Sequence, residues 1–396
     1  VDMLLTTFIV IGLYQLYRWE DKLELKGVPI AIPALLGCAV LTKGPVGIIL
    51  PLFVFGVYLL MLRKYSYLVI FKTLLYAGIS SIFLPLLWYV AAWKQGGDAF
   101  LNVVLAENFG RFFHLSTPDI HYNLGHENGV WYNFMTLAAG FVPWTIFFFF
   151  SLFGLKLHKS EKSVKEILAD TWNNIRSMEK EKLFSLVALV CIIFFYSIPS
   201  SLMPAYPFIA IFLAQYTLYI TEYRTKVTRV FAAFMASITA VVVIAVGLTM
   251  AGAIDPVKIA SQYTSRQSTL EMVELVSNMF AYPCGLTICI LIVLLAILAT
   301  VYYQMFKKIN IKILYATIAL AFAINLLIDG VVMRGIRQGS SARPFAEQVQ
   351  KEYPLDDMNM YVMNDLKTYA NLYGLNFYLG NKFHNFGQEQ PVSGFF

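Results

Sequence analysis

Charged side chains are scarce in this sequence. Asp, Glu, Lys and Arg together account for 14% of the 396 residues, whereas 58% are hydrophobic. Soluble globular proteins carry about 25% charged residues, so the composition excludes an ordinary soluble domain. The apolar residues gather into runs long enough to cross a hydrocarbon core roughly 30 Å thick. Because these runs are continuous, they exclude a transmembrane barrel as well. The sequence predicts an all-α polytopic membrane protein.

Cysteine is rare too, and all four cysteines lie in apolar segments. Cys284 and Cys289 are five residues apart, which is not a CxxC spacing, so we interpret the cysteines as packing residues. The net charge of +6 does not indicate a nucleic-acid partner, because the basic residues lie between apolar runs. No initiator Met or basic segment precedes the first run. We therefore expect a fragment that is truncated at both ends.

Ten apolar runs predict about ten helical spans. They lie at about 3–17, 27–42, 45–62, 67–92, 131–154, 183–199, 203–220, 230–252, 280–303 and 311–330. Lys and Arg are concentrated in alternate connections, at 18–26, 63–64, 156–182, 224–229 and 307–312. Cytoplasmic loops are the ones enriched in Lys and Arg, so this pattern places Lys43, 93–130, 253–279 and the tail outside.

The chain changes character after Asp329, which predicts two domains. Residues 1–330 form the transmembrane domain in this interpretation. Residues 331–396 contain a linker, a short amphipathic helix and turn signals between strand-like runs. We expect them to begin a small external α/β domain.

One basic connection also contains an apolar pattern. Within 155–182, apolar residues recur at helical spacing: Val164, Ile167, Leu168, Trp172 and Ile175. This pattern is typical of an amphipathic helix on a membrane surface.

The polar stretch that begins at Glu107 is the first candidate site. Glu107 and Arg111 are four residues apart and would share one face of a helix, either as a simple ion pair or with Glu107 orienting Arg111 toward an anion. Lys43 precedes a Gly44-Pro45 corner between two apolar runs. A snorkelling lysine and a phosphate-binding lysine both explain that position.

Histidines and aromatic residues complete the candidates. His114, His121 and His126 lack tight metal-ligand spacing, so no cofactor is required, although a divalent ion held with Glu107 stays open. Trp131 and Tyr132 suit either an interfacial aromatic belt or stacking on a sugar. A proline-rich turn at 199–207 contains Tyr206 and suits either a structural turn or a cavity wall.

Four segments together resemble a known family. LTKGPVG, ENFGRF, NGVWYNFMTLAAGFVPW and MPAYPFIAIFLA follow one another as in polytopic glycosyltransferases of the GT-C class. The chain is similar to the aminoarabinose transferase and protein mannosyltransferase-like branch over about residues 4–214, together with the external tail.

The resemblance implies an enzyme that moves a sugar from a polyprenyl-phosphate carrier to a lipid, protein or glycan acceptor. It would act at the external or periplasmic face of a bacterial inner membrane. Lys43 and Arg111 would bind the donor phosphate. Glu107, Asn108, Trp131, Tyr132 and Tyr206 would orient groups or line the cavity. The catalytic carboxylate would lie upstream of residue 1, and Asp2 resembles a different aspartate of the family.

This sequence departs from the family at two points. The basic residue and tyrosine expected before Leu202-Met203-Pro204 have no counterpart, and Asn108 stands where the aminoarabinose branch commonly has His. The first departure weakens donor-phosphate binding and the second weakens a metal site. A transporter or flippase of lipid-linked saccharides is the alternative function. A structural scaffold is a third, but a scaffold would not need the polar 93–130 segment.

Overall fold

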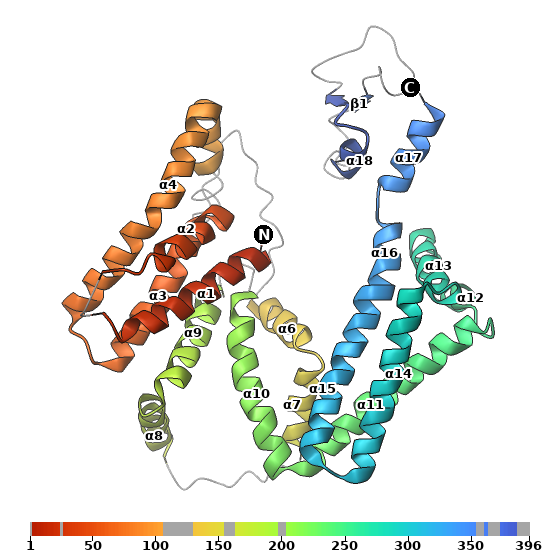
Figure 1. Ribbon diagram of the computed structural model, residues 1–396, viewed down its shortest axis with the longest axis horizontal. Coiled ribbons are helices and arrows are strands. Elements are labelled where there is room, and N and C mark those ends of the chain that lie inside the picture. Colours follow the sequence, from red (N-terminus) through yellow and green to blue (C-terminus); the bar gives the residue numbers. More distant parts are fainter. Residues whose placement is uncertain are drawn as a thin grey trace. The chain divides into compact units, whose positions relative to one another are not determined.

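The computed structural model describes residues 2–23, 27–105, 130–153, 163–196, 203–353, 360–362 and 373–385. The described part is almost entirely helical and divides into two compact units, 1–224 and 225–396 (Figure 1). The boundary that we predict at residue 330 from composition stays a prediction.

The first unit is a bundle of mostly apolar helices. Its elements are α1 (Asp2–Glu20), α2 (Ala31–Lys43), α3 (Val46–Leu62), α4 (Tyr67–Leu105), α6 (Val130–Gly140), α7 (Trp144–Leu152), α8 (Val164–Arg176), α9 (Lys180–Tyr196), η2 (Met203–Ala205) and α10 (Tyr206–Tyr223). The core lies among α1, α2, α3 and α9, where Leu13, Leu36, Phe55 and Ile192 are fully buried. Within a bilayer, lipid tails are as apolar as these side chains, so close van der Waals packing and not removal from water holds the helices together.

The corner between α2 and α3 is tight because of its glycines. Gly44 has a φ of 80°, a conformation that side chains with a Cβ rarely adopt. At Gly47 a Cβ atom would lie 2.5 Å from the backbone of Ala39 and Val40, so only glycine permits this approach of the two helices. The corner thereby fixes the position of Lys43 at the end of α2.

A single apolar run, predicted as one span over 131–154, forms two helices. α6 and α7 are bent by 102° at residues 141–143, either as a broken span or as a re-entrant segment. Pro143 cannot donate a backbone hydrogen bond, which interrupts the helix. The Thr145 hydroxyl donates to the Ala138 carbonyl at 2.6 Å and replaces part of the lost bonding. Side chains commonly satisfy backbone groups freed in this way within membranes.

The second unit is built on three long helices. Its elements are α11 (Thr225–Met250), α12 (Pro256–Ala260), α13 (Gln267–Ala281), α14 (Gly285–Lys307), α15 (Asn310–Leu327), η3 (Ile328–Val332), α16 (Met333–Gly339), α17 (Arg343–Glu352), β1 (Met360–Val362), α18 (Tyr373–Tyr378) and β2 (Phe383–Asn385). α11, α14 and α15 pack together, and α13 packs against α16. The π-helical turn η3 carries α15 into α16, so the segment predicted as a linker from 331 is helical as far as Gly339.

The described part of the tail contains a small two-stranded sheet. β1 and β2 pair in parallel, with Tyr361 opposite His384, and α18 lies between them in sequence next to α17. This arrangement has the element types that the turn signals predict. The larger external α/β domain stays a prediction.

The helices mark an integral membrane protein, but with fewer clear spans than we expected. Every predicted run forms a helix in the described part, yet only five helices are long and apolar enough to span, or six with the bent α6–α7 pair. α2 has 13 residues and α3 has 17, which corresponds to about 20 and 26 Å at 1.5 Å per residue. By the length and composition of the described helices, the predicted number of ten membrane spans is therefore not reached.

Candidate functional site

Lys43 forms an ion pair with Asp2. Its ammonium lies 2.6 Å from the Asp2 carboxylate and joins the start of α1 to the end of α2. Both side chains are close to half-exposed, so neither is withdrawn from an incoming ligand. Lys43 is therefore held in one orientation by a charge-assisted bond, in place of extending freely toward a lipid surface.

The proline-rich turn lies at the same end of the first unit. Tyr196, the last residue of α9, is within electrostatic reach of Asp2. The turn η2 follows α9 and packs against α1 and α9, with Pro204 and Ala205 buried. The described part of the turn that we predict as a structural corner or cavity wall thus borders the Asp2–Lys43 pair.

Tyr206 packs against the break between α6 and α7. Its ring stacks on Phe141 with centroids 4.8 Å apart, and Gly140 leaves the space that its hydroxyl needs. A Cβ atom at residue 140 would collide with that hydroxyl. Tyr206 therefore connects α10 to the broken helix, which places the break at the end of α10 that carries the turn.

Trp131 and Tyr132 lie in the first turn of α6, and both are exposed, Trp131 by 81%. Trp131 contacts Phe134 on its own helix, with ring centroids 6.1 Å apart. Exposed rings at a helix start suit both interpretations given above, the interfacial belt and a sugar-stacking surface.

The remaining candidates lie outside the described residues. They are Glu107, Asn108, Arg111, His114, His121 and His126. Within the described ranges, no three His, Cys, Asp or Glu side chains come together as a metal site would require.

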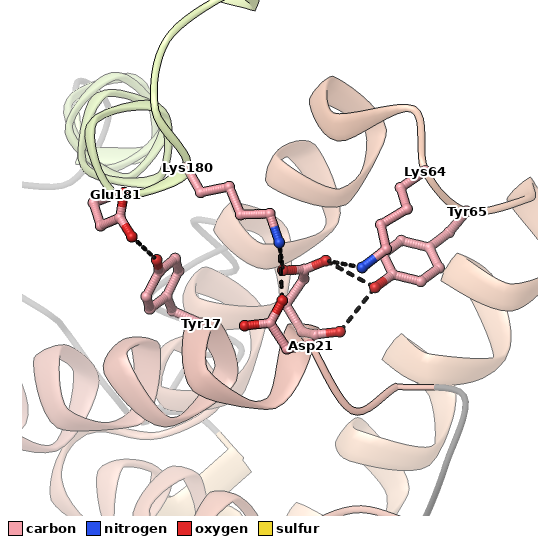
Figure 2. A network of polar contacts seen from close by, with 7 residues as sticks. Tyr17, Asp21, Lys64, Tyr65, Lys180 and Glu181 are labelled. Atoms are coloured by element: carbon pink, nitrogen blue, oxygen red, sulfur yellow. Dashed lines mark hydrogen bonds and ion pairs between the residues drawn. The ribbon is translucent and has the colours of Figure 1, made fainter.

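A second polar cluster, which the sequence did not indicate, lies at the other end of α1. The Glu20 carboxylate is 1% exposed and accepts bonds from Lys64 at 3.1 Å, Lys180 at 3.0 Å and the Tyr65 hydroxyl at 2.7 Å. Figure 2 shows Lys64 and Tyr65 converging from one side and Lys180 from the other. Since α1 has 19 residues, this cluster is about 27 Å from Asp2.

The cluster extends to two further acids. Lys180 also binds Asp21 at 2.9 Å, and Tyr17 donates to Glu181 at 3.0 Å. The hydrogen bond from Lys180 holds the pKa of Asp21 below its usual value. The bonds to Asp21 and Glu20 raise the pKa of Lys180. Each polar group in this network has a partner, so the cluster ties α1, α3 and α9 together and is not an open binding site.

Comparisons with known proteins show the fold. No protein-family model matches the chain. A protein of Aquifex aeolicus (strain VF5) described as uncharacterized is 30% identical over 213 residues, 53% of this chain and 37% of that protein. Crystal structures of ArnT from Cupriavidus metallidurans superpose with TM-scores of 0.55 in the apo state and 0.54 bound to undecaprenyl phosphate. They cover 95% and 96% of this chain at 16% identity, and 60% of the ArnT chain.

The chain thus spans less than two thirds of the length of the proteins it matches. Over its own length the chain has the fold of the ArnT structures, so the resemblance predicted from the four segments is confirmed at the level of the fold.

Proposed function

We propose that this chain is part of a membrane glycosyltransferase that moves a sugar from a polyprenyl-phosphate carrier to a lipid, protein or glycan acceptor at the external face. The observation that carries the proposal is the similarity of fold, over 96% of the chain, to an ArnT structure that holds undecaprenyl phosphate. The segments around Lys43, Arg111, Trp131 and Tyr206 add support, because they follow one another along the sequence in the order seen in the family that the chain resembles.

The reaction in this proposal is an inverting displacement at the anomeric carbon. The acceptor oxygen forms a bond to that carbon while the bond to the carrier phosphate breaks, and the electron pair leaves with the phosphate. The acceptor proton goes to a carboxylate, which the resemblance places upstream of residue 1. Negative charge therefore grows on the departing phosphate, and cations already oriented toward it stabilise the transition state.

Lys43 is the described residue that suits this role. Its ammonium is half-exposed at the α2–α3 corner, and Asp2 fixes its direction at 2.6 Å. We assign Arg111 as the second cation and Glu107 with Asn108 as its orienting groups. Trp131, Tyr132 and Tyr206 are proposed as the aromatic wall of the donor cavity.

The test is transfer from a radiolabelled polyprenyl-phosphate sugar by membranes that contain the protein. Lys43→Ala and Arg111→Ala should each lower transfer about 10²-fold, the loss seen when one preorganised electrostatic contact is removed. Lys94→Ala is the matched control, because Lys94 is another exposed lysine on the predicted external side and should leave transfer unchanged.

Transfer at the parent rate by both site variants would overturn the assignment of the phosphate site. Movement of the labelled carrier across vesicles without any transfer would instead support the alternative, a flippase of lipid-linked saccharides.

A further inference from the structure

Among the described residues, the helix α8 has an apolar face that is exposed over most of its length. Val164 is 73% exposed, Leu168 63% and Trp172 47%, and these residues recur at every fourth position. Helical residues at this spacing lie on one side, so the face is continuous along more than two turns. No residue of α8 is buried.

The helix is nevertheless well defined at its beginning. The Ser163 hydroxyl accepts a hydrogen bond from the Glu166 amide at 3.3 Å, and the Glu166 carboxylate accepts one from the Ser163 amide at 2.7 Å. This capping box satisfies two backbone donors that a helix start leaves unpaired. α8 is thus stabilised locally, and its apolar face is free for another contact.

The basic residues of α8 lie next to the apolar face, and its acidic residues lie on the opposite side. Residues advance by about 100° per position, so Lys165 and Arg176, which directly follow Val164 and Ile175, border the apolar face. Glu166 and Asp170 fall on the far side. The net charge of the helix is zero, yet the cations lie beside the apolar residues and the acids lie away from them.

Contacts at the C-terminal end of α8 position this helix relative to α1 and α9. Ile175, on the same apolar face, packs against the core of the first unit. Lys180, four residues after Arg176, begins α9. It binds Glu20 and Asp21, which belong to the polar cluster at the end of α1. Because Ile175 and Lys180 hold the end of α8, this helix lies next to the start of α9, on the side of the first unit where α1 ends (Figure 1).

We propose that α8 lies in the interface of the membrane leaflet at the Glu20 end of α1 and binds anionic phospholipid headgroups. Val164, Leu168 and Trp172 enter the acyl boundary, where tryptophan is favoured. Lys165 and Arg176 extend their charged ends to lipid phosphates, and the acids face water. An anionic leaflet fits because it is the partner that offers apolar contact and negative charge side by side.

The experiment uses the full chain in lipid nanodiscs. Its four native cysteines are replaced by Ala, and an environment-sensitive fluorophore is attached at Leu168→Cys or, as the matched control, at Asn173→Cys on the opposite side. Position 168 should be quenched by spin-labelled lipid and should be about threefold less accessible to iodide than position 173. Adding phosphatidylglycerol to phosphatidylcholine should increase the protection at 168, and Lys165→Gln/Arg176→Gln should abolish that increase.

Equal iodide access at both positions, or protection at 168 without quenching by lipid, would overturn the proposal; the second outcome would indicate a protein partner. If the cysteine-free chain does not fold, brominated lipid provides the readout. The parent chain should then be quenched more than Trp172→Phe, and equal quenching would count against the proposal.

Discussion

Glu20 is a buried carboxylate that depends on two lysines for its charge partners. Its carboxylate is 1% exposed, whereas Lys64 and Lys180, which bind it, are 49% and 43% exposed. The two lysines can turn to water when their partner is lost, but the carboxylate cannot. A buried charge without a partner costs more than the intact pair contributes.

This asymmetry gives a prediction for stability. The double variant Lys64→Met/Lys180→Met should lower the free energy of unfolding by about 2–4 kcal/mol, because the buried Glu20 charge then loses both cations and keeps the Tyr65 hydroxyl as its hydrogen-bond donor. Glu20→Leu should cost only about 1 kcal/mol, since both ammonium groups remain partly hydrated. Unfolding in detergent followed by circular dichroism measures both values.

The control is the triple variant Glu20→Leu/Lys64→Met/Lys180→Met. Replacing the whole charged group by apolar residues should recover most of the stability lost in the double variant. A triple variant as unstable as the double variant would show that the lysines act through their packing and not through the charge of Glu20.

Lys43 and Glu20 differ in how far sequence can predict them. Lys43 stands beside a Gly-Pro corner in an uncharged neighbourhood, so the sequence marks it as a candidate, either a snorkelling lysine or a phosphate-binding one. Its partner Asp2 is 41 residues away, and only folding brings the two together. In the sequence, Glu20 is followed directly by Asp21 and Lys22, a charged run that predicts an ordinary exposed acid. Its burial depends on residues 44 and 160 positions away.

At the scale of elements, the α2–α3 corner connects packing to the candidate site. Gly47→Ala would place a Cβ atom against the backbone of Ala39 and Val40, which cannot move as a flexible side chain can. We expect a loss of about 1–3 kcal/mol in stability, as overpacking typically costs, together with lower transfer because Lys43 moves with the end of α2.

The matched control is Gly247→Ala in α11, where nothing lies within 4 Å of the added Cβ atom. That change should stabilise the helix by about 0.5–1 kcal/mol, because alanine loses less conformational entropy than glycine on folding. Thermal unfolding of the two variants compares them directly. Destabilisation by Gly247→Ala of the same size as by Gly47→Ala would mean that close approach of α2 and α3 is not the cause.

Sequence predicted the existence of helices better than their extent. Apolar runs predicted every span-like helix and the amphipathic α8, because both depend on local spacing. The bend between α6 and α7 was missed, although Pro143 was visible, because a proline can also be accommodated in a continuous helix, as Pro51 is in α3. Whether a run of 13–17 residues crosses a bilayer depends on the helices packed around it, and the spacing of apolar residues within the run carries no information about those helices.

At the scale of the whole molecule, the ArnT fold is shown while the orientation in the membrane rests on the distribution of Lys and Arg. That distribution places the connection before α14 outside and the turn between α8 and α9 inside. Cys284, which the sequence predicts as a packing residue, instead stands exposed at the start of α14, so it provides a native probe of the predicted external side.

The chemistry of Cys284 suits this use. Its sulfur lies 3.4 Å from the Thr287 hydroxyl and 3.7 Å from Arg334. The hydrogen bond with Thr287, aided by backbone amides and the Arg334 charge, lowers the pKa of the thiol to about 7. Since the thiolate is the reactive form, labelling should be fast above pH 7 and should fall as the pH drops below it.

We therefore expect a membrane-impermeant maleimide to label Cys284 in intact cells that produce a chain with Ala at the other three cysteines. The pH dependence should have its midpoint near 7, and Thr287→Val should move it upward because the main stabilising bond is lost. Ser177→Cys in a chain with Cys284→Ala, in the turn after α8, should be labelled only after the cells are permeabilised. The reverse pattern of labelling would invert the orientation, and with it would place Lys43 and the proposed transfer site on the cytoplasmic face.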